Sequence, residues 1–249
     1  EQTRPDQEKY FAEGPYLQPL SFILLKKGGI MNRSIHQIIE EQIKRWELGK
    51  IKTDSPVESI NVITISRECG SRGQEVAERL AQIGGFDLFH HNLLEAMIEG
   101  SKTNKALLQT LDERGMNVVD DIVSSIVHDH HLWPDDYSKL LLRILNTIGR
   151  HGNAVILGRG ANFALEKIPA LRVRIVAPPS KRLKHIRHTL DLSLEQGQNR
   201  MISTDANRVA FVKRYFNADA ADPANYDLVI NTGTLSLDKA VQIIQDALT

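Results

Sequence analysis

The sequence has little cysteine, no net charge and no long hydrophobic run. Its one cysteine, Cys69, cannot form an internal disulfide, and no secretory signal pattern is visible, so we expect a reducing cytoplasmic location. Lysine plus arginine and aspartate plus glutamate each number 31, which leaves no global positive field for nucleic acid or anionic membranes. The longest apolar run near the start, Leu20–Leu25, is far shorter than the roughly 20 residues that span a bilayer. We therefore expect no nucleic-acid partner and no membrane association.

The composition is that of a globular protein, with 41% hydrophobic and 25% charged residues. Three segments are expected along the chain. Residues 1–30 mix proline, glycine and charges without a period, which is typical of a flexible extension. Residues 31–60 contain an amphipathic helix and a linker, and residues 61–249 form the main domain.

The expected N-terminal helix carries an apolar stripe from Ile35 to Trp46, and Gly49 is its expected stop. Such a stripe is typical of a helix that packs on its own domain. It also suits a docking helix, through which a homodimer could form.

The main domain alternates short apolar runs with helical patterns. The runs are rich in β-branched residues, and they cover residues 61–66, 86–89, 154–157, 171–177 and 227–231. Helical spacing is found at residues 74–83, 93–98, 118–127, 137–148 and 180–190, while Ser193 and Ser236 are expected to cap two further helices. This alternation predicts an α/β fold with a parallel sheet of about five strands.

The first strand runs into a glycine-containing turn, Ser66–Ala77, at the place where α/β folds bind phosphate on a helix N-terminus. The generic phosphate loop has the pattern G-x-x-x-x-G-K-[ST], in which the lysine reaches the phosphates. This turn lacks that pattern, so on its own it also fits a plain connection.

Four segments together carry a family resemblance. They are V-I-T-I-S-R-E-C-G-S-R-G-Q-E-V-A (62–77), A-V-I-L-G-R-G-A-N (154–162), R-V-R-I-V-A-P (172–178), and D-A-N-R-V-A-F-V-K-R-Y-F (205–216) followed by D-P-A-N-Y-D-L-V-I-N-T (222–232). In this order and spacing, the chain resembles the cytidylate-kinase-like family of P-loop nucleoside monophosphate kinases. The resemblance implies a three-layer α/β/α P-loop fold with a helical lid, and phosphoryl transfer that uses ATP and Mg²⁺.

The resemblance also implies how the phosphates of the donor nucleotide would be held. The residues that would hold them are Arg67, Gly70, Ser71, Arg72, Gly73, Gln74 and Glu75. Gly73 falls where ordinary cytidylate kinases have their lysine. Arg67, Arg72 or the lid would then have to supply the positive charge, because phosphoryl transfer depends on electrostatic stabilisation.

On the acceptor side, the resemblance assigns the monophosphate to Gly158, Arg159 and Gly160, although Arg159 is also suited to a structural carboxylate pair. His90 and His91 stand where relatives tend to carry Tyr-Asp-Lys, so His90 is a candidate substrate contact. Lid arginines would come from the segment after the strand at 171–177. The candidates there are Arg182 and Arg208, with Arg187 and Arg200 less favoured, and Asp205 keeps the D-x-x-R spacing with Arg208.

Three functions remain open at this point. The first is a nucleotide kinase that acts on a nucleoside monophosphate or a similar small acceptor. The second is a regulatory module that binds nucleotide without catalysis, which the missing lysine favours. The third, a dinucleotide-dependent oxidoreductase, is disfavoured because Phe163 replaces the third fingerprint glycine. The histidines of H-D-H-H (128–131) lack the helical i,i+4 spacing of metalloenzymes, so we expect a surface loop and no protein-held metal.

Overall fold

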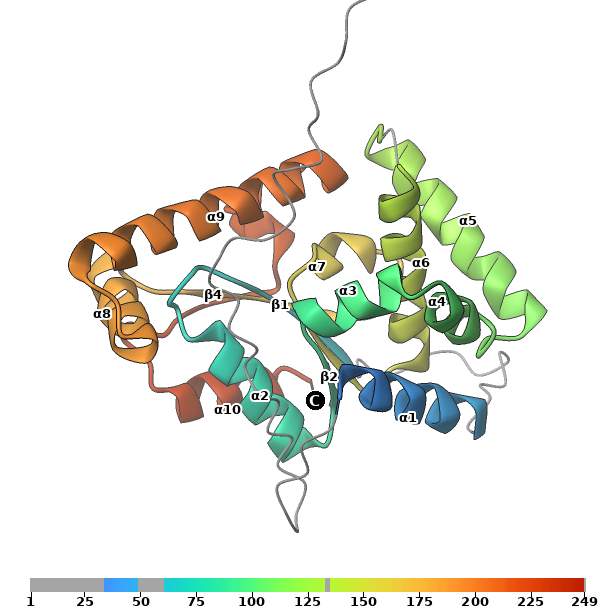
Figure 1. Ribbon diagram of the computed structural model, residues 1–249, viewed down its shortest axis with the longest axis horizontal. Helices are drawn as coiled ribbons and strands as arrows, with labels where there is room; N and C mark the ends of the chain where they lie inside the picture. The colour runs from blue at the N-terminus through green and yellow to red at the C-terminus, as the bar shows by residue number, and fades with distance from the viewer. Residues whose placement is uncertain (1–33, 49–60, 133–134, 249) are drawn as a thin grey trace, which may run out of the picture.

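The computed structural model of the protein describes residues 34–48, 61–132 and 135–248 (Figure 1). The expected extension over residues 1–30, the linker over residues 50–59 and the expected stop at Gly49 lie outside these ranges. No helix within the described ranges is long and apolar enough to cross a membrane.

Within the described residues, five strands form one parallel sheet in the order β2-β3-β1-β4-β5. The strands are β1 (Val62–Arg67), β2 (Asp87–Phe89), β3 (Ala154–Leu157), β4 (Leu171–Val176) and β5 (Leu228–Asn231). All five expected strands are confirmed. Because both faces of the sheet are covered, its strands are apolar and rich in β-branched residues, and this composition marks them in the sequence. β1 lies in the centre, where Ile63 is paired with Val155 on one side and with Leu171 on the other.

Helices surround this sheet. They are α1 (Ile35–Leu48), α2 (Gly73–Gly84), α3 (His91–Glu99), α4 (Ser101–Leu108), α5 (Glu113–Asp129), α6 (Asp136–His151), α7 (Ala161–Ala164), α8 (Pro179–Leu190), α9 (Leu194–Phe216) and α10 (Leu237–Asp246), with a 3-10 turn at Pro223–Asn225. The expected caps are confirmed: Ser193 forms a capping box with Gln196, and the Ser236 hydroxyl accepts from the N–H of Lys239. The sequence did not predict α4 or α7, because neither has a long periodic stripe.

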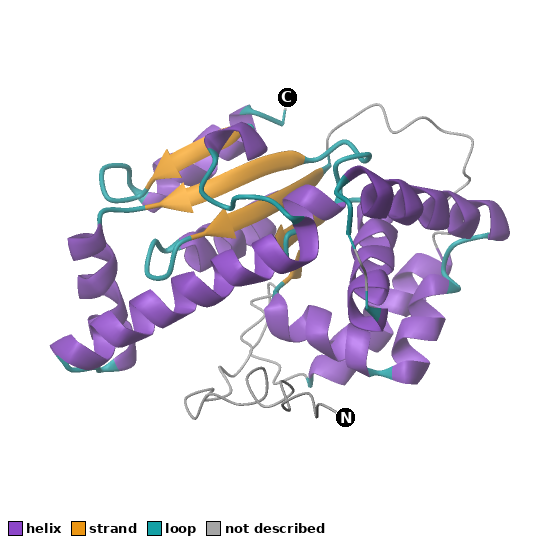
Figure 2. Cartoon of the chain, turned by 90° about the horizontal axis from the view of Figure 1, so that it is seen from above, coloured by secondary structure: helices purple, strands orange, loops and turns teal. Residues whose placement is uncertain are grey.

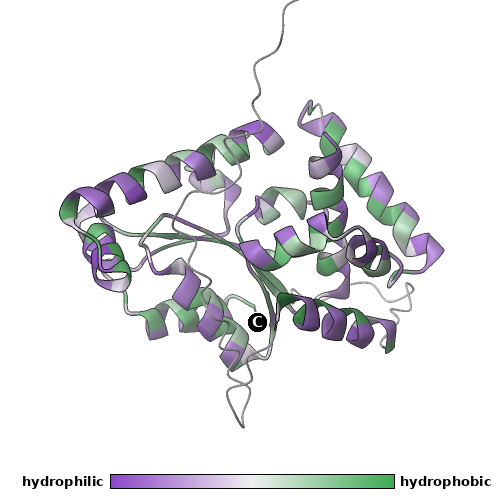
Figure 3. Cartoon of the chain, viewed as in Figure 1, coloured by the Kyte–Doolittle hydropathy of each residue, from purple (hydrophilic) through white to green (hydrophobic). Residues whose placement is uncertain are grey.

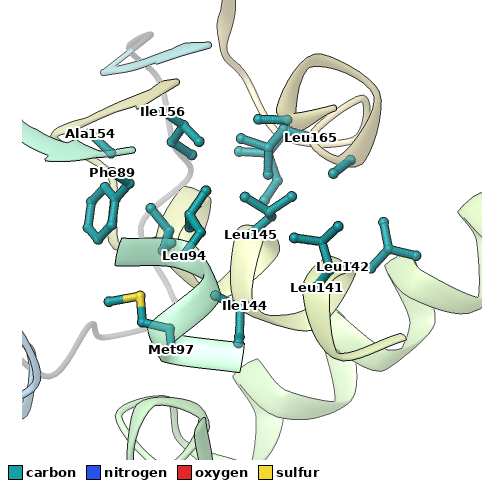
Figure 4. Packing of buried hydrophobic residues seen from close by; sticks show 14 of the residues in the cluster. Phe89, Leu94, Met97, Leu141, Leu142, Ile144, Leu145, Ala154, Ile156 and Leu165 are labelled. Atoms are coloured by element: carbon teal, nitrogen blue, oxygen red, sulfur yellow. The ribbon is translucent and has the colours of Figure 1, made fainter. Parts of the chain in front are cut away.

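Two hydrophobic clusters cover the two faces of the sheet, which makes the fold a three-layer α/β/α sandwich. On one face, Ile63, Ile65 and Val173 pack against α2 and α10. On the other face, strand residues such as Ala154 and Ile156 pack against side chains of α3, α6 and α7 (Figure 4). Figure 2 shows the strands side by side with helices on both sides of them.

The amphipathic helix α1 packs on the chain's own helices α3 and α4, and it shows both hydrophobic and hydrophilic residues in Figure 3. Its buried residues include Ile39, Ile43 and Trp46. The Trp46 ring stacks on His151 with ring centres 4.2 Å apart. The stripe therefore contributes to the core, as the first of the two alternatives predicted.

Candidate functional site

The loop between β1 and α2 lies at the carboxyl end of the central strand. Gly70 and Arg72 have left-handed backbones, with φ of 78° and 62°, and α2 begins at Gly73 directly after them. A Cβ atom at Gly70 would lie 2.6 Å from the carbonyl oxygen of Arg182, so α8 contacts the loop there. This close approach requires glycine at position 70.

Ser71 is fully buried and holds the loop in shape. Its hydroxyl donates to the Glu68 carbonyl at 2.9 Å, and its own carbonyl accepts from the Thr232 hydroxyl at 2.7 Å. The Ser71 hydroxyl therefore has a structural partner already.

The second loop arginine, Arg72, is paired with a carboxylate. Its Nε and Nη2 atoms donate to the two oxygens of Glu75 at 2.9 and 2.6 Å, and His185 lies 3.3 Å from the same carboxylate. The hydrogen bond with Arg72 lowers the pKa of Glu75, and it raises the pKa of Arg72. The charge of Arg72 is therefore paired within the loop and α2, and the neutral side chain of Gln74 donates to Glu78 at 2.9 Å.

The lid candidates of α8 and α9 are bonded to the backbone of the loop. Oδ1 of Asp205 accepts from the Cys69 N–H at 2.7 Å, and Oδ2 forms an ion pair with the buried guanidinium of Arg182. Arg182 also donates to the Cys69 carbonyl at 3.3 Å, while Nη1 of Arg208 donates to the Arg67 carbonyl at 3.1 Å. The D-x-x-R pair thus contacts the loop backbone on both sides of Glu68. Arg187 lies elsewhere, exposed and bonded to the Leu192 carbonyl, and Arg200 is exposed on α9.

Arg159 follows β3 and is held by residues from two other helices. Its Nη2 atom lies 2.8 Å from Oε1 of Glu95, and its Nε atom donates to Nδ1 of His91 at 3.0 Å. Its guanidinium also lies over the Phe211 ring, 4.9 Å from the ring centre. The structural carboxylate pair that the sequence allowed is therefore present. Nη1 of Arg159 makes no hydrogen bond within the described residues.

The pKa shifts of His91, Glu95 and Tyr137 are consistent with their contacts around Arg159. Burial, and then the charges of Arg159 and Arg67, lower the pKa of His91 to about 4, so a neutral ring accepts the hydrogen bond from Arg159. Burial raises the pKa of Glu95 against the opposing effect of Arg159. Burial also raises the pKa of Tyr137, whose hydroxyl donates to Glu95 at 2.9 Å.

Arg67, the last residue of β1, lies between these groups. Burial, and then the charges of Arg208 and Arg159, lower the pKa of its guanidinium. Within the described residues, no carboxylate pairs with Arg67 and its guanidinium makes no hydrogen bond. Three arginines from β1, the end of β3 and α9 thus gather beside the loop, and one of them has no counter-ion.

The remaining predicted residues have other partners. His90 caps α3, with Nδ1 accepting from the Leu93 N–H at 3.4 Å, and burial lowers its pKa to about 4. Gly158 and Gly160 have left-handed backbones, and Gly160 is required because a Cβ there would meet the Phe216 ring. The expected surface loop at H-D-H-H is wrong for its first half, because the helix of α5 continues through His128 and Asp129 and only His130 and His131 follow it. His130 contacts Glu166 at 3.1 Å.

The described residues do not form a magnesium site of their own. No group of three histidine, cysteine or acidic side chains within the described ranges could hold a metal ion. The loop hydroxyl of Ser71 and the carboxylate of Asp205 are both bonded to protein groups. Mg²⁺ in nucleotide enzymes is often bound largely by the substrate phosphates, so we derive no catalytic step from a metal held by this chain.

Sequence reasoning missed the residues that hold Arg159. Glu95 and Tyr137 come from α3 and α6, and Phe211 comes from α9. Nothing in their local spacing connects them, because they meet only when the helices pack on the sheet. His91 was noticed for its place beside His90, without any sign that it binds Arg159.

Comparisons with known proteins identify the family of the chain. A sequence model of the cytidylate kinase-like family matches residues 62–234. The cytidylate kinase of Staphylothermus marinus is 27% identical over 95 residues, which are 38% of this chain and 54% of that protein. The match therefore spans about half the length of this curated relative.

Solved structures resemble the fold. An uncharacterised protein from Eubacterium ventriosum superposes with a TM-score of 0.61 at 21% identity, over 77% of this chain and 98% of that one. A shikimate kinase from Bacteroides thetaiotaomicron gives a TM-score of 0.43 at 14% identity, over 75% of this chain and 97% of that one. With its sheet order and the family match over residues 62–234, the chain belongs to the cytidylate kinase-like family and has a three-layer α/β/α fold with a parallel sheet.

Proposed function

We propose that the protein transfers the γ-phosphoryl group of ATP to the phosphate of a nucleoside monophosphate such as CMP, or to a similar small acceptor. The bond between the γ-phosphorus and the β,γ-bridging oxygen breaks, and a bond from that phosphorus to an acceptor phosphate oxygen forms. The products are ADP and the nucleoside diphosphate. Membership of the family supports a phosphotransferase, and the acceptor class is the proposal.

The observation that carries this proposal is the gathering of Arg67, Arg159 and Arg208 beside the loop. Phosphoryl transfer is mostly positioning and the stabilisation of spread negative charge. Arg67 has no carboxylate partner, Arg159 keeps Nη1 unbonded, and Arg208 uses Nη1 for the Arg67 carbonyl and makes no other hydrogen bond within the described residues. Their remaining N–H groups suit the oxygens of two phosphate groups.

The chain's other groups act as positioning residues in this account. Asp205 and Arg182 fix the loop backbone at Cys69, and Glu95 with His91 fixes the plane of the Arg159 guanidinium. Preorganised donors of this kind need no reorganisation during the reaction. Magnesium would be brought to the site on the phosphates of the nucleotide.

A second candidate is a regulatory module that binds nucleotide without catalysis. It is favoured by Gly73 at the position of the usual lysine, and by the Ser71 hydroxyl being bonded to Glu68. Both candidates predict nucleotide binding, and only the kinase predicts acceptor-dependent turnover.

A coupled ADP-release assay tests the proposal. The purified protein is given ATP, Mg²⁺ and each of a panel of nucleoside monophosphates, beside an Arg159→Ala variant and an Arg143→Ala control. Arg143 is a surface arginine paired with Asp120 at 2.8 Å. We expect one acceptor to stimulate ADP release, and Arg159→Ala to lower turnover roughly 100-fold, as for loss of one charge-stabilising contact. ATP binding without acceptor-dependent turnover would favour the regulatory module.

A further inference from the structure

The side chain of Arg67 lies against two glycines, Gly73 and Gly158. A Cβ atom built on Gly73 would lie 2.6 Å from Cβ and 3.1 Å from Cγ of Arg67. A Cβ atom built on Gly158 would lie 2.2 Å from Nη1 at the other end of the same side chain. Real Cβ atoms do not approach other atoms this closely, so a side chain at either position would displace Arg67.

The positions of Arg67 and Gly73 can be compared with those of the generic phosphate-loop pattern. In G-x-x-x-x-G-K-[ST], the first glycine and the lysine are six positions apart. Arg67 stands at the first glycine here, and Gly73 stands at the lysine. The small residue and the cation have exchanged places. Because Gly73 lies directly against the Arg67 stem, the two positions are neighbours in space.

Arg67 and Arg72, the two arginines of the loop, differ in whether a carboxylate is paired with them. Arg72 is held by both oxygens of Glu75, at 2.9 and 2.6 Å. Arg67 has no such partner within the described residues, and the arginines nearest to it, Arg208 and Arg159, repel it. A partly buried cation among like charges is stabilised by an anion that binds there.

We propose that Arg67, whose side chain fills the space beside Gly73 and Gly158, takes the place of the phosphate-loop lysine, so that its guanidinium binds the polyphosphate chain of the donor nucleotide. This inference rests on the proposed function and specifies which residue supplies the charge. Arg72 then serves to shape the loop.

Binding of inorganic tripolyphosphate, measured by calorimetry without any acceptor, tests this role. Arg67→Gln keeps most of the stem and removes the charge, and we expect it to weaken binding by about 30-fold or more, as for loss of a charge-assisted contact. Arg79→Gln on α2 is the matched control, because Arg79 pairs with Asp238 away from the loop. We expect the control to bind as the wild type does.

A sharper test moves the positive charge from position 67 to position 73. Gly73→Lys alone should weaken binding, because the new stem overlaps that of Arg67. The double variant Arg67→Gly with Gly73→Lys puts glycine and lysine at the first and seventh positions of the generic pattern, while Arg72 and Gln74 still depart from it. We expect its affinity to return to within about fivefold of the wild type. If the double variant binds no better than Arg67→Gln, or if Arg72→Gln weakens binding more than Arg67→Gln does, the assignment is wrong.

Thermal unfolding separates this role from a structural one. Removal of a cation that has no counter-ion should leave the melting temperature of Arg67→Gln unchanged or raised, whereas a structural arginine would lower it. The inference and the proposed function can also fail separately. Unchanged tripolyphosphate binding in Arg67→Gln with normal turnover would reject only the role of Arg67. Weakened binding, with no turnover of any nucleoside monophosphate by the wild type, would support that role and reject the acceptor class.

Discussion

The backbone N–H of Cys69 donates to Oδ1 of Asp205 at 2.7 Å, which joins the loop between β1 and α2 to helix α9 across 136 residues of sequence. The other oxygen of Asp205 is paired with Arg182, itself buried to 9% exposure. The shape of the loop therefore depends on the position of α8 and α9.

We expect Asp205→Asn to lower the free energy of unfolding by about 2 kcal/mol, because it removes the nearer carboxylate of the buried Arg182 and leaves only the longer contact with Glu68 at 3.6 Å. Urea unfolding measures the change. Asp238→Asn is the matched control, since Asp238 is paired with Arg79 at the surface, and its cost should stay below about 0.5 kcal/mol. Equal costs for the two variants would contradict the role given to the Asp205 network.

Alkylation of Cys69 should weaken ATP binding. The N–H of Cys69 donates to Asp205, and the carbonyl of Cys69 accepts from Arg182. A group attached to the thiol would disturb both hydrogen bonds. It is the only cysteine of the chain, which makes the reaction specific. We expect Cys69→Ser to bind ATP and to resist the reagent, and bound ATP to slow the reaction of the wild type. Alkylated protein with full ATP affinity would contradict this prediction.

Glu95→Gln should raise the KM for the acceptor more than the KM for ATP. The substitution removes the charge that holds Arg159 at 2.8 Å but keeps a group that can bond to Tyr137. Steady-state kinetics with each substrate varied in turn measures the two constants. Glu99→Gln on the same helix is the control, because Glu99 is exposed there. An equal rise in the KM for the acceptor and the KM for ATP would show that Arg159 does not act specifically on the acceptor.

The stability of the protein should fall as the pH drops from about 6.5 towards 4. Burial lowers the pKa of His151 from 6.5 to about 4, while its ring stacks on Trp46 and bonds to the Thr110 hydroxyl at 2.8 Å. In this pH window the unfolded chain binds a proton that the folded chain does not, so the free energy of unfolding decreases with falling pH. The contribution of His151 is on the order of 2 kcal/mol.

Urea unfolding at several pH values checks this prediction. His151→Gln should unfold with a shallower dependence on pH between 6.5 and 4 than the wild type does. His188→Gln, at an exposed histidine of α8, is measured alongside as the control. A His151→Gln profile parallel to that of the wild type would show that His151 is not the cause.

The fold was largely predictable from the sequence, and the partners within the site were not. Apolar β-branched runs identify the strands because both faces of the sheet are covered, and Ser193 and Ser236 marked two helix starts. Helix α4 was missed because Ser101–Leu108 begins with polar residues and buries only Leu107.

The turn between the first strand and the following helix was predicted, yet the sequence does not decide between Arg67 and Arg72 as the cation that would contact phosphate. That choice depends on the bonds of Arg72 to Glu75 and on the contacts of Arg67 with two glycines, one of them in a different strand connection. Contacts of this kind form only in the folded chain. The same holds for Arg159 and His91, which are 68 residues apart.

Analysis of the reaction products is the most direct measurement of the proposed kinase activity. The wild-type protein is incubated with ATP, Mg²⁺ and CMP, and the nucleotides are separated by anion-exchange chromatography over time. We expect CDP and ADP to appear in equal amounts, with Arg67→Gln and Arg159→Ala forming both far more slowly. ADP without any nucleoside diphosphate, for CMP and for every other monophosphate tried, would contradict the account.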